Sequence, residues 1–343
     1  MITSQYYSNK QLNLGLVLIL VLITRPCFAE SNIALSFIDL SHAIPTFAPS
    51  RENSTKPDLN KPVGASTPIA GFYHQAVLYP VDKWPTSDGH FESSAVLIQE
   101  HNGTSFNAPN HFFNNAKSKE NGSLAFSKRK AAHELATEQL TGDIVLVDVS
   151  QRVKKELANN GGVPSPDIKV TNFSDNSQAT IRAADIRAVA DQIKQGVWIV
   201  GRVGWEQFYF SGTEDWSTSL YVNNLNHPGF TAEAIAEIIA IMDEKKITIS
   251  GIAADSFSTD SGQGAKGTDD KWSNAWPAHV RLYQRDILIV ENLTNLGKLA
   301  QQEGQCSLMV GALNHIGGTG GPARVMAVCA QIQDAYISQK SKS

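Results

Sequence analysis

The sequence has no excess of positive charge and no repeats, and each of these shortages removes a class of protein. Its formal net charge is −4, which argues against a phosphate-binding surface and therefore against nucleic acid as a partner. No internal repeat, low-complexity segment or block of like charges supports a purely structural surface protein. The 42% hydrophobic and 18% charged residues are instead typical of a soluble globular protein with a sizeable core.

Only one long apolar run occurs, Leu14–Ile23, and its flanks are those of a secretory signal peptide. Lys10 precedes the run, and the small-residue ending Cys27-Phe-Ala29 follows it. Ten residues are too few to span a bilayer, which needs about 20. We therefore expect residues 1–29 to be a cleaved signal peptide and the protein to be exported, periplasmic or secreted. The mature chain would carry a net charge of −6, since Lys10 and Arg25 leave with the signal, and it should not be membrane-bound.

Cysteine is also scarce, and export would leave only Cys306 and Cys329. Both lie in apolar, strand-like segments near the C-terminus. In an oxidising compartment two cysteines can pair. Two buried thiols that behave as small hydrophobic side chains are the alternative, and the sequence leaves both open.

Short apolar runs alternate with helical patterns along residues 30–335, which indicates a single α/β domain followed by a polar tail at 336–343. The strongest helix is predicted at 231–246. Thr231 is its expected N-cap, and Lys245 and Lys246 at its C-terminal end have the sign of charge that the helix dipole favours. A second helical pattern covers 183–195, and Ser50–Pro68 is predicted to be a polar loop. Strands are expected at 37–42, 96–100, 144–149, 197–200, 247–252, 286–290, 307–311 and 323–332.

The stretch His101-Asn-Gly-Thr-Ser-Phe-Asn-Ala-Pro-Asn-His111 carries the clearest chemical signal. A Gly-Thr turn and a proline shape the backbone between two histidines, and a period of two aims Ser105 and Asn107 to one side. Histidine nitrogens and carboxylate oxygens bind divalent transition metals when a turn lets them converge. From these residues alone, a polar turn with two incidental histidines explains the stretch about equally well.

This stretch resembles the His-x-Gly-Thr-His-x-Asp-x-Pro-x-His signature of the cyclase family, which includes kynurenine formamidases and isatin hydrolases. Further segments resemble that family in the same order. They are Phe37-Ile-Asp-Leu-Ser-His42, Gly204-Trp205, His227-Pro-Gly-Phe230, Ile249-Ser-Gly-Ile-Ala-Ala-Asp255, the pair His279 and Glu291, and Gly320-Gly-Pro-Ala-Arg324. The resemblance covers about residues 33–332 and implies a central mixed, barrel-like β-sheet flanked by helices. It also implies a homodimer or homotetramer.

The resemblance implies roles for individual residues. His101, Asn107, His279 and Glu291 would be metal ligands, and His111 would be the catalytic acid/base. Ser105 stands where the family has a second histidine and Asn107 where it has an aspartate, so the metal site is degenerate. We expect one weak divalent ion, Zn²⁺ or Mn²⁺, or no ion at all.

Two functions remain open on the sequence. The first is metal-dependent hydrolysis of an amide or formamide, lactam or lactone bond, as in an arylformamidase, in which a metal-bound water attacks and His111 moves the proton. The second is a non-catalytic protein that binds a small molecule in the same pocket. Retention of His101, His111, His279 and Glu291 favours the enzyme, and the changes at positions 105 and 107 favour the binder.

Other residues carry weaker signals. Trp84 lies where the family often places substrate-contacting aromatics, and a core or rim position is equally plausible. Asp255 is expected to fix a turn, and Gly317-Gly-Thr-Gly-Gly321 is expected to bring backbone close to the pocket, because it lacks the Lys-Ser/Thr of a phosphate loop. His90 or His315 could replace the ligand missing at Ser105.

Overall fold

The computed structural model of the chain describes residues 32–44, 46–47, 76–83, 92–111, 129–165, 167, 169–171, 173, 177–209, 219–262 and 276–333. The predicted signal peptide, the polar loop Ser50–Pro68, Trp84, His90 and the tail at 336–343 lie outside the described residues. Among the ranges just given, no helix is long and apolar enough to cross a membrane.

The central feature is a mixed sheet that closes on itself. Its strands follow the order β1-β11-β10-β6-β7-β8-β9-β5, and β11 also pairs with β5, so seven strands form a closed barrel and β1 adds to its edge. Strands β6 to β9 are parallel, whereas β5, β10 and β11 pair antiparallel with their neighbours. The bounds are β1 Asn32–Asp39, β5 Ser105–Asn107, β6 Thr141–Asp148, β7 Trp198–Arg202, β8 Gly251–Ala254, β9 Leu288–Glu291, β10 Cys306–Ala312 and β11 Gly320–Gln333.

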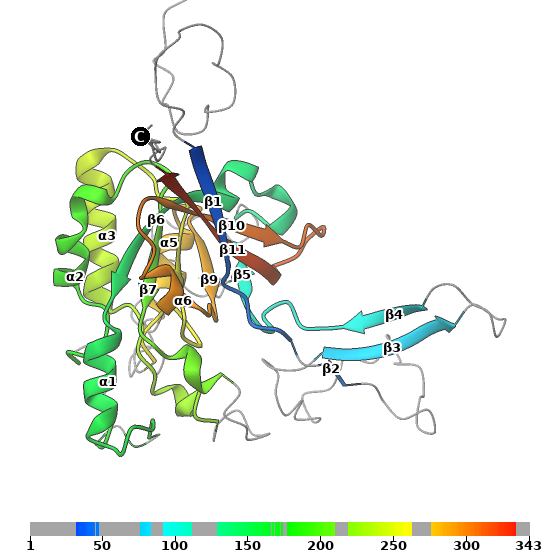
Figure 1. Cartoon of the computed structure of the whole chain (residues 1–343), viewed down its shortest axis with the longest axis horizontal. Helices are drawn as coiled ribbons and strands as arrows, with labels where there is room; N and C mark the ends of the chain where they lie inside the picture. Colours follow the sequence, from blue (N-terminus) through cyan, green and yellow to red (C-terminus); the bar gives the residue numbers. More distant parts are fainter. Residues whose placement is uncertain are drawn as a thin grey trace, which may run out of the picture. The chain divides into compact units, whose positions relative to one another are not determined.

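Helices lie against one part of this sheet (Figure 1). Successive side chains of a strand point to opposite faces of the sheet, so the protein has two hydrophobic cores. On β7, Trp198 and Val200 face the barrel interior, whereas Ile199 packs with the helices. The α-helices are α1 Ser150–Ala158, α2 Ala183–Ala188, α3 Ala232–Lys245, α5 Pro277–Tyr283 and α6 Leu296–Leu299. The 3₁₀ helices are η3 Ala132–Glu134, η4 Thr137–Leu140, η5 Ala190–Gln192, η6 Glu206–Phe208 and η7 Asn223–Leu225.

The predicted α/β fold with a barrel-like sheet is confirmed, and most elements lie where the sequence places them. In α3, the Thr231 hydroxyl accepts the Ala234 N–H as the expected N-cap, and Lys246 ends the helix in a left-handed conformation. The predicted helix at 183–195 is instead split into α2 and η5. Its last residues turn toward the next strand, because Ile193 leaves the helix in an extended conformation.

A separate sheet of three strands consists of β2 (Thr46–Phe47), β3 (Ala76–Lys83) and β4 (Glu92–Leu97). Strands β3 and β4 form an antiparallel pair with a register shift between Pro80 and Asp82. The strand expected at 96–100 is thus the end of β4, and the chain turns at Glu100 into the histidine motif.

Cys306 and Cys329 form a disulfide, which decides between the two alternatives left open by the sequence. They are direct partners in the register of β10 and β11, with a Cα–Cα distance of 4.0 Å. The bridge therefore joins two neighbouring strands of the barrel wall.

Candidate active site

The short strand β5 carries the central part of the histidine motif. It pairs with β9 on one side and β11 on the other, and Ser105 lies directly opposite Glu291. Phe106 points into the barrel core, so Ser105 and Asn107 share the opposite side, as the period of two predicts. Both are fully buried.

Two glycines allow the turn before β5 to approach its neighbours. Gly103 has a φ of +68°, and a Cβ there would lie 2.5 Å from Ile44 Cγ1. A Cβ on Gly320 would lie 2.4 Å from the Phe106 carbonyl oxygen and 2.7 Å from His101 Cε1. Only glycine at position 320 therefore lets the His101 ring lie against β11.

His101, Asn107 and Glu291 form a hydrogen-bonded chain. The Asn107 amide donates to Glu291 Oε2 at 2.9 Å, which turns its carbonyl toward His101. That carbonyl lies 2.6 Å from His101 Nδ1, and because a carbonyl only accepts, the Nδ1 atom carries a proton. The other ring nitrogen, Nε2, faces the Thr319 hydroxyl at 3.3 Å.

His279 lies on α5 and is held by Asp260, a residue that the sequence reading did not single out. Asp260 Oδ2 lies 2.6 Å from His279 Nδ1, and Asp260 Oδ1 accepts the Ala278 N–H at 2.7 Å. The opposite ring nitrogen, Nε2, lies 3.5 Å from Glu291 Oε1. Burial lowers the pKa of His279, but the hydrogen bond to Asp260 and the charge of Glu291 outweigh it and raise that pKa.

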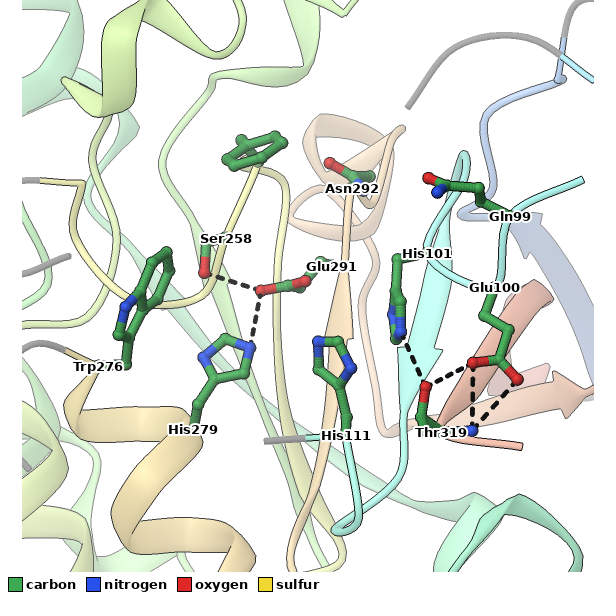
Figure 2. A pocket seen from close by; sticks show the side chains of 11 residues that line it. Gln99, Glu100, His101, His111, Ser258, Trp276, His279, Glu291, Asn292 and Thr319 are labelled. Atoms are coloured by element: carbon green, nitrogen blue, oxygen red, sulfur yellow. Dashed lines mark hydrogen bonds and ion pairs between the residues drawn. The ribbon is translucent and has the colours of Figure 1, made fainter. Parts of the chain in front are cut away.

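His101, His279 and Glu291 border a cavity of about 460 Å³ (Figure 2). His279, His111 and His101 lie in a row beneath Glu291, with Thr319 and Glu100 beyond His101. The described lining consists of Gln99, Glu100, His101, His111, Phe257, Ser258, Trp276, His279, Glu291, Asn292 and Thr319.

His111 lies between the other two histidines. Its ring centroid is 3.7 Å from that of His101 and 6.1 Å from that of His279. Burial, followed by the charges of His101 and His279, lowers the pKa of His111 to about 2. The ring is therefore neutral at physiological pH.

The donor set in this arrangement does not fit the metal ion that the resemblance implies. Within the described part of the chain, no group of three or more His, Cys, Asp or Glu side chains is placed to hold a metal. Asn107 presents N–H to Glu291, and the buried Ser105 hydroxyl has no hydrogen-bond partner among the described residues. What remains are His279 Nε2 and Glu291, fewer than the three protein ligands usual at a catalytic zinc.

The remaining predicted residues are accounted for as follows. Asp255 accepts the N–H groups of Val203 and Gly204 at 2.7 and 2.8 Å, so it shapes that turn as expected. His315 does not replace a ligand near Ser105, since its Nε2 lies 2.6 Å from Glu100 Oε1 instead. The Gly317–Gly321 turn brings Thr319 to the cavity, where its backbone N–H donates to Glu100.

Comparison with known proteins agrees with the motifs. A family model described as "Putative cyclase" matches residues 38–261, about two thirds of the chain. Its match ends before His279 and Glu291, which the fold brings to the same cavity. No protein of curated function matches the chain.

Solved structures share the fold. An isatin hydrolase bound to the product analogue thioisatinate is 21% identical with a TM-score of 0.54, over 87% of this chain and 93% of that one. Isatin hydrolase A from Labrenzia aggregata, bound to benzyl benzoate, is 21% identical with a TM-score of 0.55, over 87% and 94%. A novel cyclase is 17% identical with a TM-score of 0.52, over 85% and 88%. At these identities the likeness is one of fold, and with the family match it shows that the chain belongs to the Cyclase family.

Proposed function

We propose that this protein is an exported hydrolase that cleaves an amide or formamide, lactam or lactone bond of a small molecule in the His101–His111–His279 cavity. The observation that carries the proposal is the placement of three histidines and Glu291 around one cavity of about 460 Å³. That volume falls in the range of small-molecule sites, and Phe257 and Trp276 supply aromatic walls. The isatin hydrolases with the same fold act on a lactam, which supports this bond class.

His111 and His279 are placed so that each can take one part in hydrolysis. His111 lies between the other two histidines at the cavity, where its ring could take a proton from the attacking water and return it to the leaving nitrogen or oxygen. His279 is oriented by Asp260 with Nε2 toward Glu291, where it can donate to the carbonyl oxygen. The donor set does not fit the Zn²⁺ or Mn²⁺ that the family resemblance implies, and no step here depends on such an ion.

The test is a hydrolysis assay of the full chain against N-formyl anilines, isatin-like lactams and aryl lactones. We expect turnover of at least one class, and His111→Ala should lower kcat/KM by roughly 10²- to 10⁴-fold. The control Arg285→Ala removes an exposed cation paired with Asp243 outside the cavity and should leave kcat/KM unchanged. Turnover that survives His111→Ala would contradict the assigned role.

One observation favours a second candidate, a small-molecule binding protein without catalysis. His101, Asn107 and Glu291 direct their polar atoms at one another rather than at a common point. If no compound is hydrolysed but one binds by calorimetry, and His111→Ala weakens that binding, the binder is the better description.

Export and assembly are part of the proposal. The disulfide between Cys306 and Cys329 supports an oxidising compartment, and the mass of the secreted protein should correspond to a chain that begins at Glu30. A homodimer or homotetramer is supported by edge strand β1, where Leu35 and Phe37 are 58% and 64% exposed. Light scattering of the mature protein tests the assembly.

A further inference from the structure

Asn107 is a fully buried polar residue beside the cavity that the proposed hydrolysis does not use. We infer that its amide takes the structural place of a metal ion: it joins His101 to Glu291, so the pocket forms through hydrogen bonds and without a divalent cation. The inference rests on the proposed function only in its choice of this pocket as the functional site. It holds for an enzyme and for a binding protein alike.

The chemistry of an amide explains the substitution. Asn107 donates to Glu291 Oε2 at 2.9 Å and accepts from His101 Nδ1 at 2.6 Å. An aspartate in that position could only accept, so two carboxylates would face each other in a buried site. Such a pair needs a cation between its members or must take up a proton. The amide removes that need.

The chain of hydrogen bonds continues beyond Glu291. On the His101 side, the Thr319 hydroxyl donates its one hydrogen to Glu100 at 2.5 Å, so its contact with His101 Nε2 at 3.3 Å adds no hydrogen bond to a neutral ring. At the other end, Glu291 Oε1 accepts from the Ser258 hydroxyl at 2.8 Å and from the Thr259 N–H at 3.0 Å. Both Glu291 oxygens therefore have protein donors, and the carboxylate is stabilised without an ion.

Ser105 is an independent observation that points the same way. Its Cα pairs with that of Glu291 in the β5–β9 register, and its side chain is fully buried. An imidazole at this position would offer a nitrogen beside the Glu291 carboxylate. A serine hydroxyl is shorter and offers an oxygen that transition metals bind poorly.

The experiment compares the melting temperature (Tm) of Asn107→Asp with that of the wild type, each in EDTA and in excess Zn²⁺ or Mn²⁺. The wild-type Tm should be the same in both conditions. Asn107→Asp should melt roughly 5–10 °C lower in EDTA and recover with metal, because the ion neutralises the new carboxylate pair. The double variant Ser105→His/Asn107→Asp should recover further, with about one ion per chain by elemental analysis.

Asn226→Asp is the matched control. Asn226 is equally buried and donates to the carbonyls of Ser165 and Thr171 outside the cavity, so its variant should lose stability without metal rescue. Tightly held metal in the wild type, or a wild-type Tm that falls in EDTA, would overturn the inference. If Asn107→Asp does not fold, the metal content of the wild type and the effect of EDTA on its Tm still test the inference. No substrate enters this test, so its failure is distinguishable from failure of the hydrolase proposal.

Discussion

At the scale of residues, the pocket depends on side chains that hold other side chains in position. Asp260 is fully buried and accepts from the His279 ring and from the Ala278 backbone, which fixes both the ring and the start of α5. The carboxylate behind the histidine accepts from Nδ1 and fixes the orientation of the ring, so Nε2 is presented to Glu291. Asp260 is thus a positioning residue.

Gly320 is a residue-scale feature that can be tested directly. Gly320→Ala would place a Cβ 2.4 Å from the Phe106 carbonyl oxygen and 2.7 Å from His101 Cε1, and backbone cannot yield as a flexible side chain can. We expect the free energy of unfolding in urea to fall by about 1–3 kcal/mol. Gly297→Ala is the control, because its Cβ meets only the end of the Arg202 side chain at 3.2 Å. Equal stability of the two variants would refute this argument.

At the scale of elements, the site is built where short segments meet. Strand β5 has three residues, yet it pairs on both sides, so the position of the histidine motif is set by β9 and β11 together. Helix α5 adds His279, and its first residue is proline, which has no N–H to satisfy at that position. Helix α5 and strand β9 bring His279 and Glu291 to the cavity, whereas His101, His111 and Thr319 lie in the segments next to β5 and β11.

The start of α1 gives a prediction about pH at this scale. Asp148 accepts the Ser150 N–H at 2.9 Å and pairs with Arg202 at 2.7 Å. Burial raises the pKa of Asp148, but the hydrogen bonds from Ser150 and Arg202 outweigh it and hold that pKa below its usual 3.8. Because the folded pKa is depressed, the carboxylate stabilises the fold above pH 3.8, and this contribution is lost as the pH falls through the folded value.

Asp148→Asn should therefore lower the free energy of unfolding by about 0.5–1 kcal/mol at pH 7, with solvent screening taken into account. The difference from wild type should shrink toward zero below the folded pKa. Urea unfolding of both proteins at a series of pH values measures this difference in the free energy of unfolding. Asp243→Asn, which removes a more exposed partner of Arg285, is the control and should have a smaller effect. A difference that stays constant with pH would show that the charge of Asp148 is not responsible.

At the scale of the whole molecule, closure of the barrel ties the C-terminal strands to the site. Strand β11 pairs with β10 over one part of its length and with β5 over another, so the wall that holds Cys329 continues into the wall beside Asn107. The disulfide closes a loop between residues 23 positions apart in that wall. Stabilisation of β10 and β11 thereby supports the pocket.

Loss of this bridge should lower stability measurably. Cys306→Ser/Cys329→Ser should reduce the free energy of unfolding by about 3 kcal/mol, the chain-entropy value for a loop of this length. A reducing agent should lower the Tm of the wild type and leave that of the double variant unchanged. Two titratable thiols in the secreted wild-type protein would contradict the prediction.

Much of the fold could be predicted from the sequence because the signals are local. Apolar runs of four to eight residues indicate buried strands, and the spacing of Ile235, Ile238 and Met242 indicates one face of α3. The alternation that aims Ser105 and Asn107 to one side follows from strand geometry alone. Helix α5 was not predicted, because seven residues are too few for a periodic pattern to stand out.

The amino-acid sequence by itself determined which chemical groups the motif contains, including the exchange of an aspartate for Asn107. Only the tertiary structure decided what those groups do. Asn107 and Glu291 are 184 residues apart, and their hydrogen bond exists because β5 and β9 become neighbours in the closed sheet. The contact between Asp260 and His279 and the Cys306–Cys329 bridge depend on the tertiary structure in the same way. Local sequence patterns indicate the periods of strands and helices, but they do not indicate which separate segments come together.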